Sequence, residues 1–263
     1  MHPILFELGN FPIYTYGFIL AWAITIGLFL VFYLAEKRGL NGWDAVDIVL
    51  WGTVIGILGA RFGYIIQRPA YFIEHWGEIL NFRSGGITII GAIIFGNITF
   101  VVLSKRYKIP TWLCLDINTA PILLGMAIGR IGCLMHGCCY GKICSASLWW
   151  AIHYPANSPL GDAPRHPSQI YELLLDLILM SACLWFFKRA NFQGQVFWLG
   201  ITGYAAIRFF TEFFRDSCLY GPFSLAQWFC LAAFVLALLG FLGVYGRPKL
   251  VSYPQADPDE QKT

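Results

Sequence analysis

The chain has 263 residues, of which 57% are hydrophobic and 13% are charged. Soluble domains average about 45–50% apolar and about 25% charged residues, so this composition excludes an ordinary soluble globular fold. A formal net charge of +3 leaves no basic face that could hold a nucleic acid. The composition therefore predicts a protein embedded in a lipid bilayer.

Seven apolar runs are long enough to cross a bilayer, whose hydrocarbon core requires about 20 predominantly apolar residues in a helix. The sequence therefore predicts an all-α, polytopic integral membrane protein with about seven transmembrane helices. The fourth run is the least regular, because Asp116, Asn118 and Pro121 interrupt it. In chain order, the predicted spans cover residues 16–35, 45–66, 87–103, 111–128, 170–187, 196–213 and 225–244.

Basic residues predict the orientation of these spans, since Lys and Arg are retained on the cytoplasmic side of a membrane. Clusters of basic residues follow the first, third, fifth and seventh runs, beginning at Lys37, Lys105, Lys188 and Arg247. All four clusters share one face if the N-terminus lies outside and the C-terminus lies in the cytoplasm. The sequence predicts this topology.

The same topology predicts the domain organisation. Residues 1–251 form a single transmembrane domain, whose outer-face loops, 67–86 and 129–169, are too short to be separate soluble domains. Segment 252–263 contains Pro, Asp and Glu with little apolar content, so it is predicted to be a disordered cytoplasmic tail.

Three arginines lie inside or at the ends of the predicted spans, where an ionisable group costs several kcal/mol and marks a functional site. Arg61, Arg130 and Arg208 each fall near the end of a span that runs outward, so they reach a similar depth in the outer half of the membrane. Arg165 and His166 come to the same level just before the fifth span. A guanidinium group can bind two phosphate oxygens at once, in a bidentate manner. The arginines at this depth therefore predict a phosphate-binding site.

The structural alternative is that each arginine reaches the interface or pairs with an acid, as Arg208 could with Glu212 one turn later. Three arginines at one depth favour the phosphate site over this alternative. The glycines beside them leave room for close approach of a helix or a ligand. These glycines are Gly59, Gly63, Gly129 and Gly132.

A transporter or channel is the alternative from another functional class, with the arginines lining an anion path. Such a protein is expected to carry charges at several depths and to consist of two related halves. The arginines of this chain instead gather on the outer side, and no second half of the sequence resembles the first.

Four cysteines follow the fourth span, at Cys133, Cys138, Cys139 and Cys144, with His136 between the first two. Thiolates and an imidazole this close together could hold zinc, although adjacent cysteines make joint tetrahedral ligation awkward. A disulfide such as Cys133–Cys144 would suit an oxidising outer face, and free, packed thiols are the third alternative. We predict no metal site and no cofactor.

The chain resembles the prolipoprotein diacylglyceryl transferase family in three motifs, which follow one another in the family's order. RHPSQIYE at 165–172 is the most specific of them. The resemblance covers about residues 10–245, and the family's topology of seven spans with the N-terminus outside agrees with the one predicted from charge. The other matches are GRIG at 129–132 with Gly137 and Gly141, the series Tyr204, Arg208, Glu212 and Arg215, and weaker ones at Tyr16-Gly17, 59–64 and Ser224-x2-Gln227.

The resemblance implies an enzyme of the bacterial cytoplasmic (inner) membrane. It would move the diacylglyceryl group of phosphatidylglycerol, or a related anionic phospholipid, onto the lipobox cysteine of a prolipoprotein, releasing glycerol phosphate. The implied catalytic residues are Arg130, which would bind the lipid phosphate, Arg208, which would stabilise the leaving phosphate, and Tyr204 and Glu212, which would shape the site together with Arg61. The remaining implied substrate-binding residues are Tyr16, Gly129, Gly132, Gly141, Arg165, Ser168 and Gln169.

The sequence departs from the family's pattern at the group that activates the thiol. The family's histidine, usually given the role of base, falls on Ile90, which cannot accept a proton. The family's asparagine and acidic residue fall on Cys133 and Cys138. Either His136 or His166 takes the proton, or the chain is a paralogue that uses a different acceptor or no longer performs the parent reaction. Because Ile90 cannot act as the base, we expect transfer to a standard lipobox thiol to be slow or absent.

Overall fold

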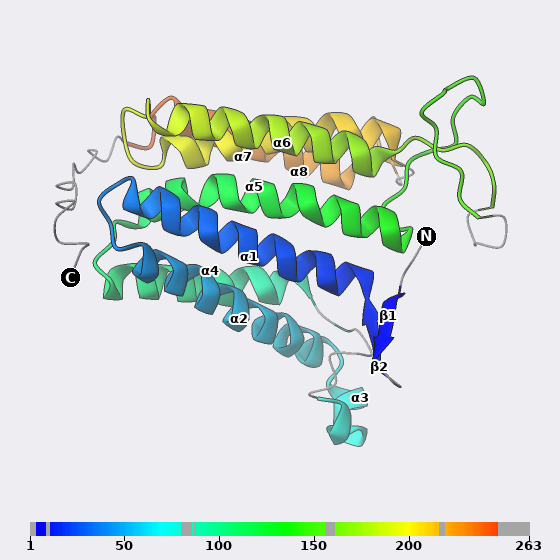
Figure 1. Cartoon of the computed structure of the whole chain (residues 1–263), viewed down its shortest axis with the longest axis horizontal. Helices are drawn as coiled ribbons and strands as arrows, with labels where there is room; N and C mark the ends of the chain where they lie inside the picture. The colour runs from blue at the N-terminus through cyan, green and yellow to red at the C-terminus, as the bar shows by residue number, and fades with distance from the viewer. Residues whose placement is uncertain are drawn as a thin grey trace. The chain divides into compact units, whose positions relative to one another are not determined.

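The structure is a computed structural model that describes residues 4–8, 11–79, 86, 88–155, 161–215 and 219–246. Helices make up most of the described chain (Figure 1). Each of the seven predicted apolar runs overlaps one helix within these residues. The helices are α1 (Thr15–Glu36), α2 (Gly42–Gln67), α4 (Ile89–Arg106), α5 (Thr111–His136), α6 (Ser168–Phe187), α7 (Gln195–Thr211) and α8 (Leu225–Phe241).

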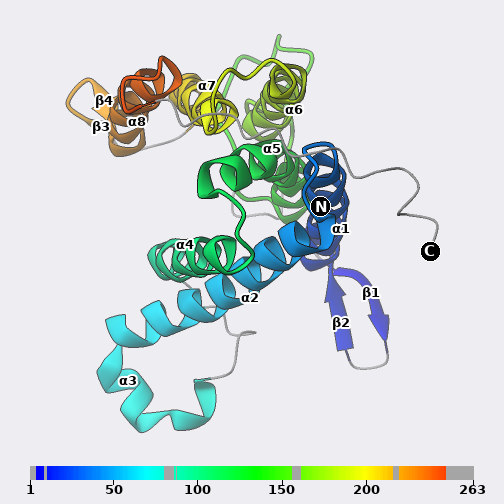
Figure 2. The ribbon, with the colours of Figure 1, turned by 90° about the vertical axis from the view of Figure 1, so that its left-hand side faces the viewer.

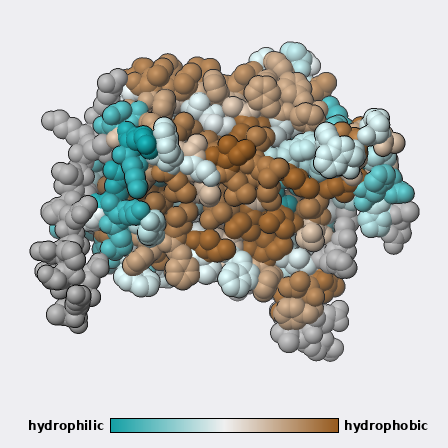
Figure 3. All heavy atoms as spheres, turned by 45° about the horizontal axis from the view of Figure 1, so that its top comes forward, coloured by the Kyte–Doolittle hydropathy of each residue, from teal (hydrophilic) through white to brown (hydrophobic). Residues whose placement is uncertain are grey.

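Four of these helices are long and apolar enough to cross a membrane, namely α1, α2, α5 and α6, and α8 is a shorter apolar helix. The model therefore agrees with a mostly helical membrane protein, while seven crossings and their orientation stay predictions. Apolar side chains cover much of the face drawn in Figure 3, as expected of helices that contact lipid. Phe29 is 73% exposed and Phe229 is 69% exposed.

The structure also contains elements that the sequence analysis did not predict. Short antiparallel pairs join β1 (Ile4–Leu8) to β2 (Phe11–Tyr14), and β3 (Leu219–Tyr220) to β4 (Phe223–Ser224). The loop predicted at 67–86 contains α3 (Pro69–Glu74) and the 3-10 helix η1 (Trp76–Glu78), and η3 (Glu212–Phe214) follows α7. The predicted tail 252–263 and parts of both predicted outer loops, 80–85 and 156–160, lie outside the described residues.

The described residues divide into two compact units, which we call unit A and unit B. Unit A comprises residues 31–114, and unit B comprises residues 1–30 and 115–251. The prediction of one transmembrane domain over residues 1–251 stays a prediction.

In unit A, α2 packs along α4 (Figure 2). Glycines line this contact, because a Cβ atom on Gly91 would collide with the carbonyl oxygen of Gly59. A Cβ atom on Gly56 would lie 3.3 Å from the carbonyl oxygen of Ala92. Small residues thus let the two backbones approach closely, as is common between membrane helices.

In unit B, α7 packs between α6 and α8 (Figure 2). The buried Asp116 of α5 accepts hydrogen bonds from the backbone N–H groups of Gly194, at 2.7 Å, and Phe197, at 2.8 Å. These are N–H groups at the start of α7, where a helix has no carbonyl partners of its own. Asp116, one of the residues that interrupt the fourth apolar run, therefore caps another helix.

Candidate active site

Glu172 lies in the second turn of α6, where three arginines of unit B meet its carboxylate. Arg208 of α7 donates to its Oε1 at 3.0 Å and Arg215 donates to the same oxygen at 3.2 Å. Arg130 of α5 forms an ion pair with its Oε2. The Glu172 side chain is only 1% exposed, so the pairing takes place away from bulk water, where ionic hydrogen bonds are strong.

Glu212 supplies a second carboxylate beside the first. It lies 2.8 Å from Nη2 of Arg208, and its Oε1 accepts a hydrogen bond from Ser224 at 3.1 Å. Ser224 also caps α8, because its side chain accepts from the Gln227 backbone N–H. We call Arg130, Glu172, Arg208, Glu212 and Arg215 the arginine–glutamate cluster. Its three guanidinium groups and two carboxylates leave one net positive charge.

The cluster contains three residues that the sequence analysis proposed as catalytic, Arg130, Arg208 and Glu212. The structural alternative for Arg208 is also realised, because it does pair with Glu212. The roles of Glu172 and Arg215 were missed, although both lie in the quoted motifs. The available signal was charge: three arginines near one buried site require acidic partners.

The residues before Glu172 hold the loop that follows α5. Ser168 donates to the carbonyl of Cys139 at 2.8 Å, and Gln169 donates to the carbonyl of Cys138 at 2.8 Å. Both side chains are buried. Ser168 and Gln169, predicted to bind substrate, therefore position this loop in the structure.

Gly141 lies where three segments converge. A Cβ atom there would lie 2.8 Å from both the Cβ of His166 and the carbonyl oxygen of Phe214, so a larger residue does not fit. Arg165 donates to the Gly141 carbonyl at 3.2 Å and stacks over Tyr140, 4.9 Å from its ring centroid. Arg165 and Gly141, both predicted substrate-binding residues, thus fix the fold of the loop between α5 and α6.

The two histidines considered as proton acceptors have different surroundings. The Nδ1 atom of His166 lies 3.2 Å from the hydroxyl of Tyr171, and its ring packs on Phe214 with centroids 5.2 Å apart. These contacts match a loop-holding role for His166. His136 is exposed at the end of α5.

The other predicted residues of unit B lie on the helices that build the cluster. Tyr204 precedes Arg208 by one turn of α7 and lies within electrostatic reach of Arg130. Tyr16 packs against Gly132, where an added Cβ atom would lie 2.8 Å from the ring. Gly129 has no such neighbour within 4 Å, so the helix surface beside Arg130 is open there.

Arg61 belongs to unit A and is buried, at 4% exposure. It donates to the backbone carbonyls of Glu78, Ile79 and Gly86, at 2.9 Å for the last two. Its guanidinium group thus ties α2 to the loop that follows it. The structure gives Arg61 a role in holding this loop within unit A.

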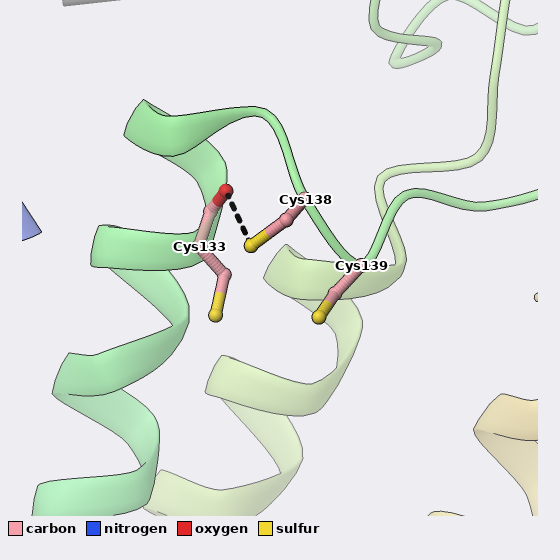
Figure 4. A group of neighbouring side chains, drawn as sticks. All are labelled: Cys133, Cys138 and Cys139. Carbon is pink, nitrogen blue, oxygen red and sulfur yellow. Dashed lines mark hydrogen bonds between the residues drawn. The ribbon is translucent and has the colours of Figure 1, made fainter. Parts of the chain in front are cut away.

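Three cysteines form a separate group (Figure 4). Arg215 of the arginine–glutamate cluster adjoins this group, because it interacts with Cys139. The sulfur atoms of Cys133, Cys138 and Cys139 all lie within 4.8 Å of one another. A hydrogen bond with Cys133, together with the Arg215 guanidinium, lowers the pKa of the Cys139 thiol to about 4, whereas burial raises the pKa of Cys138. Cys133 and Cys144 are free thiols in this structure, so it does not contain the disulfide considered between them.

A cavity of about 150 Å³ opens beside the cluster. Arg215, Glu212 and Ser224 line it together with Lys142 of the loop between α5 and α6. Apolar side chains, including Phe213 and Leu219, line it as well. The cavity thus combines cationic, hydroxyl and apolar groups, which suits a small polar anion that carries an apolar part.

Comparison with known proteins places these motifs in a wider context. The family model described as prolipoprotein diacylglyceryl transferase matches residues 3–243. A phosphatidylglycerol–prolipoprotein diacylglyceryl transferase of Synechocystis sp. is 34% identical over 253 residues, which cover 92% of this chain and 88% of that protein. Proteins with the same name from Lactobacillus delbrueckii subsp. bulgaricus and Lactiplantibacillus plantarum are 31% and 32% identical, covering 95% and 83% of this chain and 92% and 80% of their own length.

Proposed function

The chain belongs to the prolipoprotein diacylglyceryl transferase family, and we propose that it moves the diacylglyceryl group of phosphatidylglycerol onto the lipobox cysteine of a prolipoprotein. The observation that carries this proposal is the arginine–glutamate cluster. It gathers three guanidinium groups from α5, α7 and the segment after α7 at one buried position, with one net positive charge.

The chemistry of the reaction requires such a charge. The acceptor sulfur attacks a carbon of the diacylglyceryl group as a thiolate, a carbon–oxygen bond breaks, and glycerol phosphate leaves. The leaving phosphate monoester carries more negative charge than the phosphodiester of the lipid. Fixed cations that face this developing charge lower the barrier. In this chain, Arg130 and Arg208 would serve as those cations, and Arg215 would extend them toward the cavity.

The two glutamates keep these cations in place. Glu172 contacts all three arginines, and Glu212 contacts Arg208 and lies 3.8 Å from Nε of Arg215. Their carboxylates fix the guanidinium planes before the lipid arrives, so little reorganisation is needed during the reaction. The net charge of the cluster still favours an incoming anion.

We further propose that the chain is a multi-pass protein of the bacterial cytoplasmic membrane, with seven spans, the N-terminus outside and the C-terminus in the cytoplasm. The basic clusters after α1, α4 and α6 support this orientation, because they would all lie on the cytoplasmic side. The arginine–glutamate cluster would then lie near the outer leaflet, where a secreted prolipoprotein presents its cysteine.

The direct test uses the full-length protein in detergent with phosphatidylglycerol labelled in its acyl chains and a lipobox peptide. The label should move to a peptide with cysteine and not to a peptide with serine at that position. Arg130→Ala should abolish transfer, whereas Arg189→Ala, at an exposed arginine that stacks on Trp185, should not. Absence of labelled peptide with the unmodified protein would refute the proposed reaction.

A further inference from the structure

The proposed function assigns no role to three cysteines that lie close together. We call Cys133, Cys138 and Cys139 the thiol triad. Their sulfur atoms point into one common space and lie within 4.8 Å of one another (Figure 4). Sulfur ligands of one zinc ion, each about 2.3 Å from the metal, lie roughly 4 Å apart. We propose that the thiol triad is a metal site, which binds Zn²⁺ with three thiolates and leaves a fourth position open.

The backbone explains how adjacent cysteines can both face one ion. Cys139 has a φ of 60°, a left-handed conformation that is uncommon for a residue with a side chain. This turn directs the side chains of Cys138 and Cys139 toward Cys133 at the end of α5. The objection that adjacent cysteines ligate awkwardly therefore does not apply to this loop.

Hydrogen bonds from neighbouring residues also fix the backbone of the loop that carries Cys138 and Cys139. Gln169 and Ser168, buried at the start of α6, donate hydrogen bonds to the carbonyls of Cys138 and Cys139. The backbone N–H of Cys138 donates to the carbonyl of Cys133 at 3.1 Å. Metal sites need ligands that are fixed before the ion binds, and these bonds provide that support.

The ligand set and the surrounding charge indicate the kind of ion. Thiolates select soft or borderline ions such as Zn²⁺ rather than Mg²⁺ or Ca²⁺. Three thiolates with one Zn²⁺ carry a single negative charge, and Arg215, which forms a hydrogen bond with Cys139, can balance it. Three protein ligands with an open fourth position are typical of catalytic zinc sites, since structural sites have four.

The open coordination position gives the ion a role in activating the acceptor thiol, and this role rests on the proposed function. The acceptor thiol of the prolipoprotein would occupy it as the fourth ligand, and a thiol that coordinates such an ion loses its proton, here to water. The resulting thiolate attacks the diacylglyceryl carbon, the sulfur–carbon bond forms, and the carbon–oxygen bond to glycerol phosphate breaks. The ion would supply the activation that Ile90 cannot supply as a base.

The metal site is tested without any activity measurement. The full-length protein in detergent is treated with a chelator, and Co²⁺ or Zn²⁺ is then added. We expect about one Zn²⁺ per chain, and a near-ultraviolet absorption band from thiolate-bound Co²⁺. Cys139→Ser and Cys138→Ser should each lose the band, whereas Cys144→Ser, which changes a thiol outside the triad, should keep it.

Two results would overturn the metal site. One is the absence of the Co²⁺ band in the unmodified protein. The other is an equal loss of the band in Cys144→Ser. Thermal unfolding of each variant shows whether it is folded. Two triad variants are used so that the conclusion does not depend on a single variant that fails to fold.

The acceptor role has its own readout. A lipobox peptide with cysteine should shift the Co²⁺ band, and the same peptide with serine should leave it unchanged. If the metal binds but the cysteine peptide causes no shift, or if Cys139→Ser transfers lipid at the full rate, the acceptor role is wrong. If the unmodified protein binds the metal but transfers no lipid, the proposed function fails while the metal site stands.

Discussion

Arg130 of α5 forms an ion pair with Glu172 of α6, and the loop that carries Cys138 and Cys139 connects directly to the end of α5. Glu172 follows Ser168 and Gln169, which hold that loop by its carbonyls. The first turns of α6 thus position the three arginines through the Glu172 carboxylate, and they position the thiol triad through Ser168 and Gln169. The groups proposed to bind the lipid and the groups proposed to activate the thiol are therefore positioned by the same helix.

Glu172→Gln should destabilise the protein and lower its activity together. The amide keeps the shape of the side chain but removes the negative charge that faces three arginines. Removing one partner of a buried ion pair costs about 3–5 kcal/mol. We expect a lower thermal unfolding temperature in detergent and at least about a 100-fold loss of lipid transfer. Glu74→Gln, at an exposed glutamate at the end of α3, is the matched control; equal behaviour of the two variants would contradict the central role of Glu172.

Arg208→Lys should fail to replace the arginine although it conserves the charge. Arg208 contacts Glu172 and Glu212 with two different nitrogen atoms, at 3.0 and 2.8 Å. A lysine has one nitrogen and cannot reproduce both contacts and a lipid contact. We expect about a 100-fold fall in the transfer rate, measured with labelled phosphatidylglycerol. A lysine variant with near-normal transfer would show that charge alone is sufficient.

Gly141→Ala should disrupt the loop between α5 and α6, because the added methyl group would collide with the backbone of His166 and Phe214. Overpacking of this kind costs about 1–3 kcal/mol. We expect lower thermal stability and loss of transfer. Gly125→Ala is the control, since no atom lies within 4 Å of its added Cβ and alanine favours a helix by about 0.5–1 kcal/mol. Equal stability of the two variants would argue against the close packing around Gly141.

Reporter tags should reveal the orientation. A tag at the C-terminus should report the cytoplasm, and a tag inserted after Pro155, in the loop between α5 and α6, should report the exterior. The basic clusters predict both results. Reversal of either one would place the arginine–glutamate cluster away from the outer leaflet and remove its access to a secreted acceptor.

Apolar runs were enough to predict all seven long helices, because a membrane helix needs only length and hydrophobicity. They did not show where α5 ends: the predicted end at residue 128 was wrong, since the helix continues to His136. Gly129 and Gly132 lie inside this helix although glycine is a weak helix former, so local propensity does not reveal the boundary.

The site was predicted in part. Motif positions indicated Arg130, Arg208 and Glu212, and the structure brings these three together. The convergence on Glu172 depends on the packing of α5, α6 and α7, which no single segment encodes. The adjacency of Cys138 and Cys139 likewise suggested poor ligand geometry, because the left-handed backbone at Cys139 is not evident from the residue type.

The most direct measurement of the central claim is the mass of a lipobox peptide after incubation with the full-length protein and phosphatidylglycerol of defined acyl chains. The account predicts that the cysteine peptide gains the mass of one diacylglyceryl group, in a thioether that resists hydroxylamine, and that Arg130→Ala and Arg208→Ala give no such gain. An unmodified cysteine peptide in the presence of folded protein and bound lipid would contradict the account.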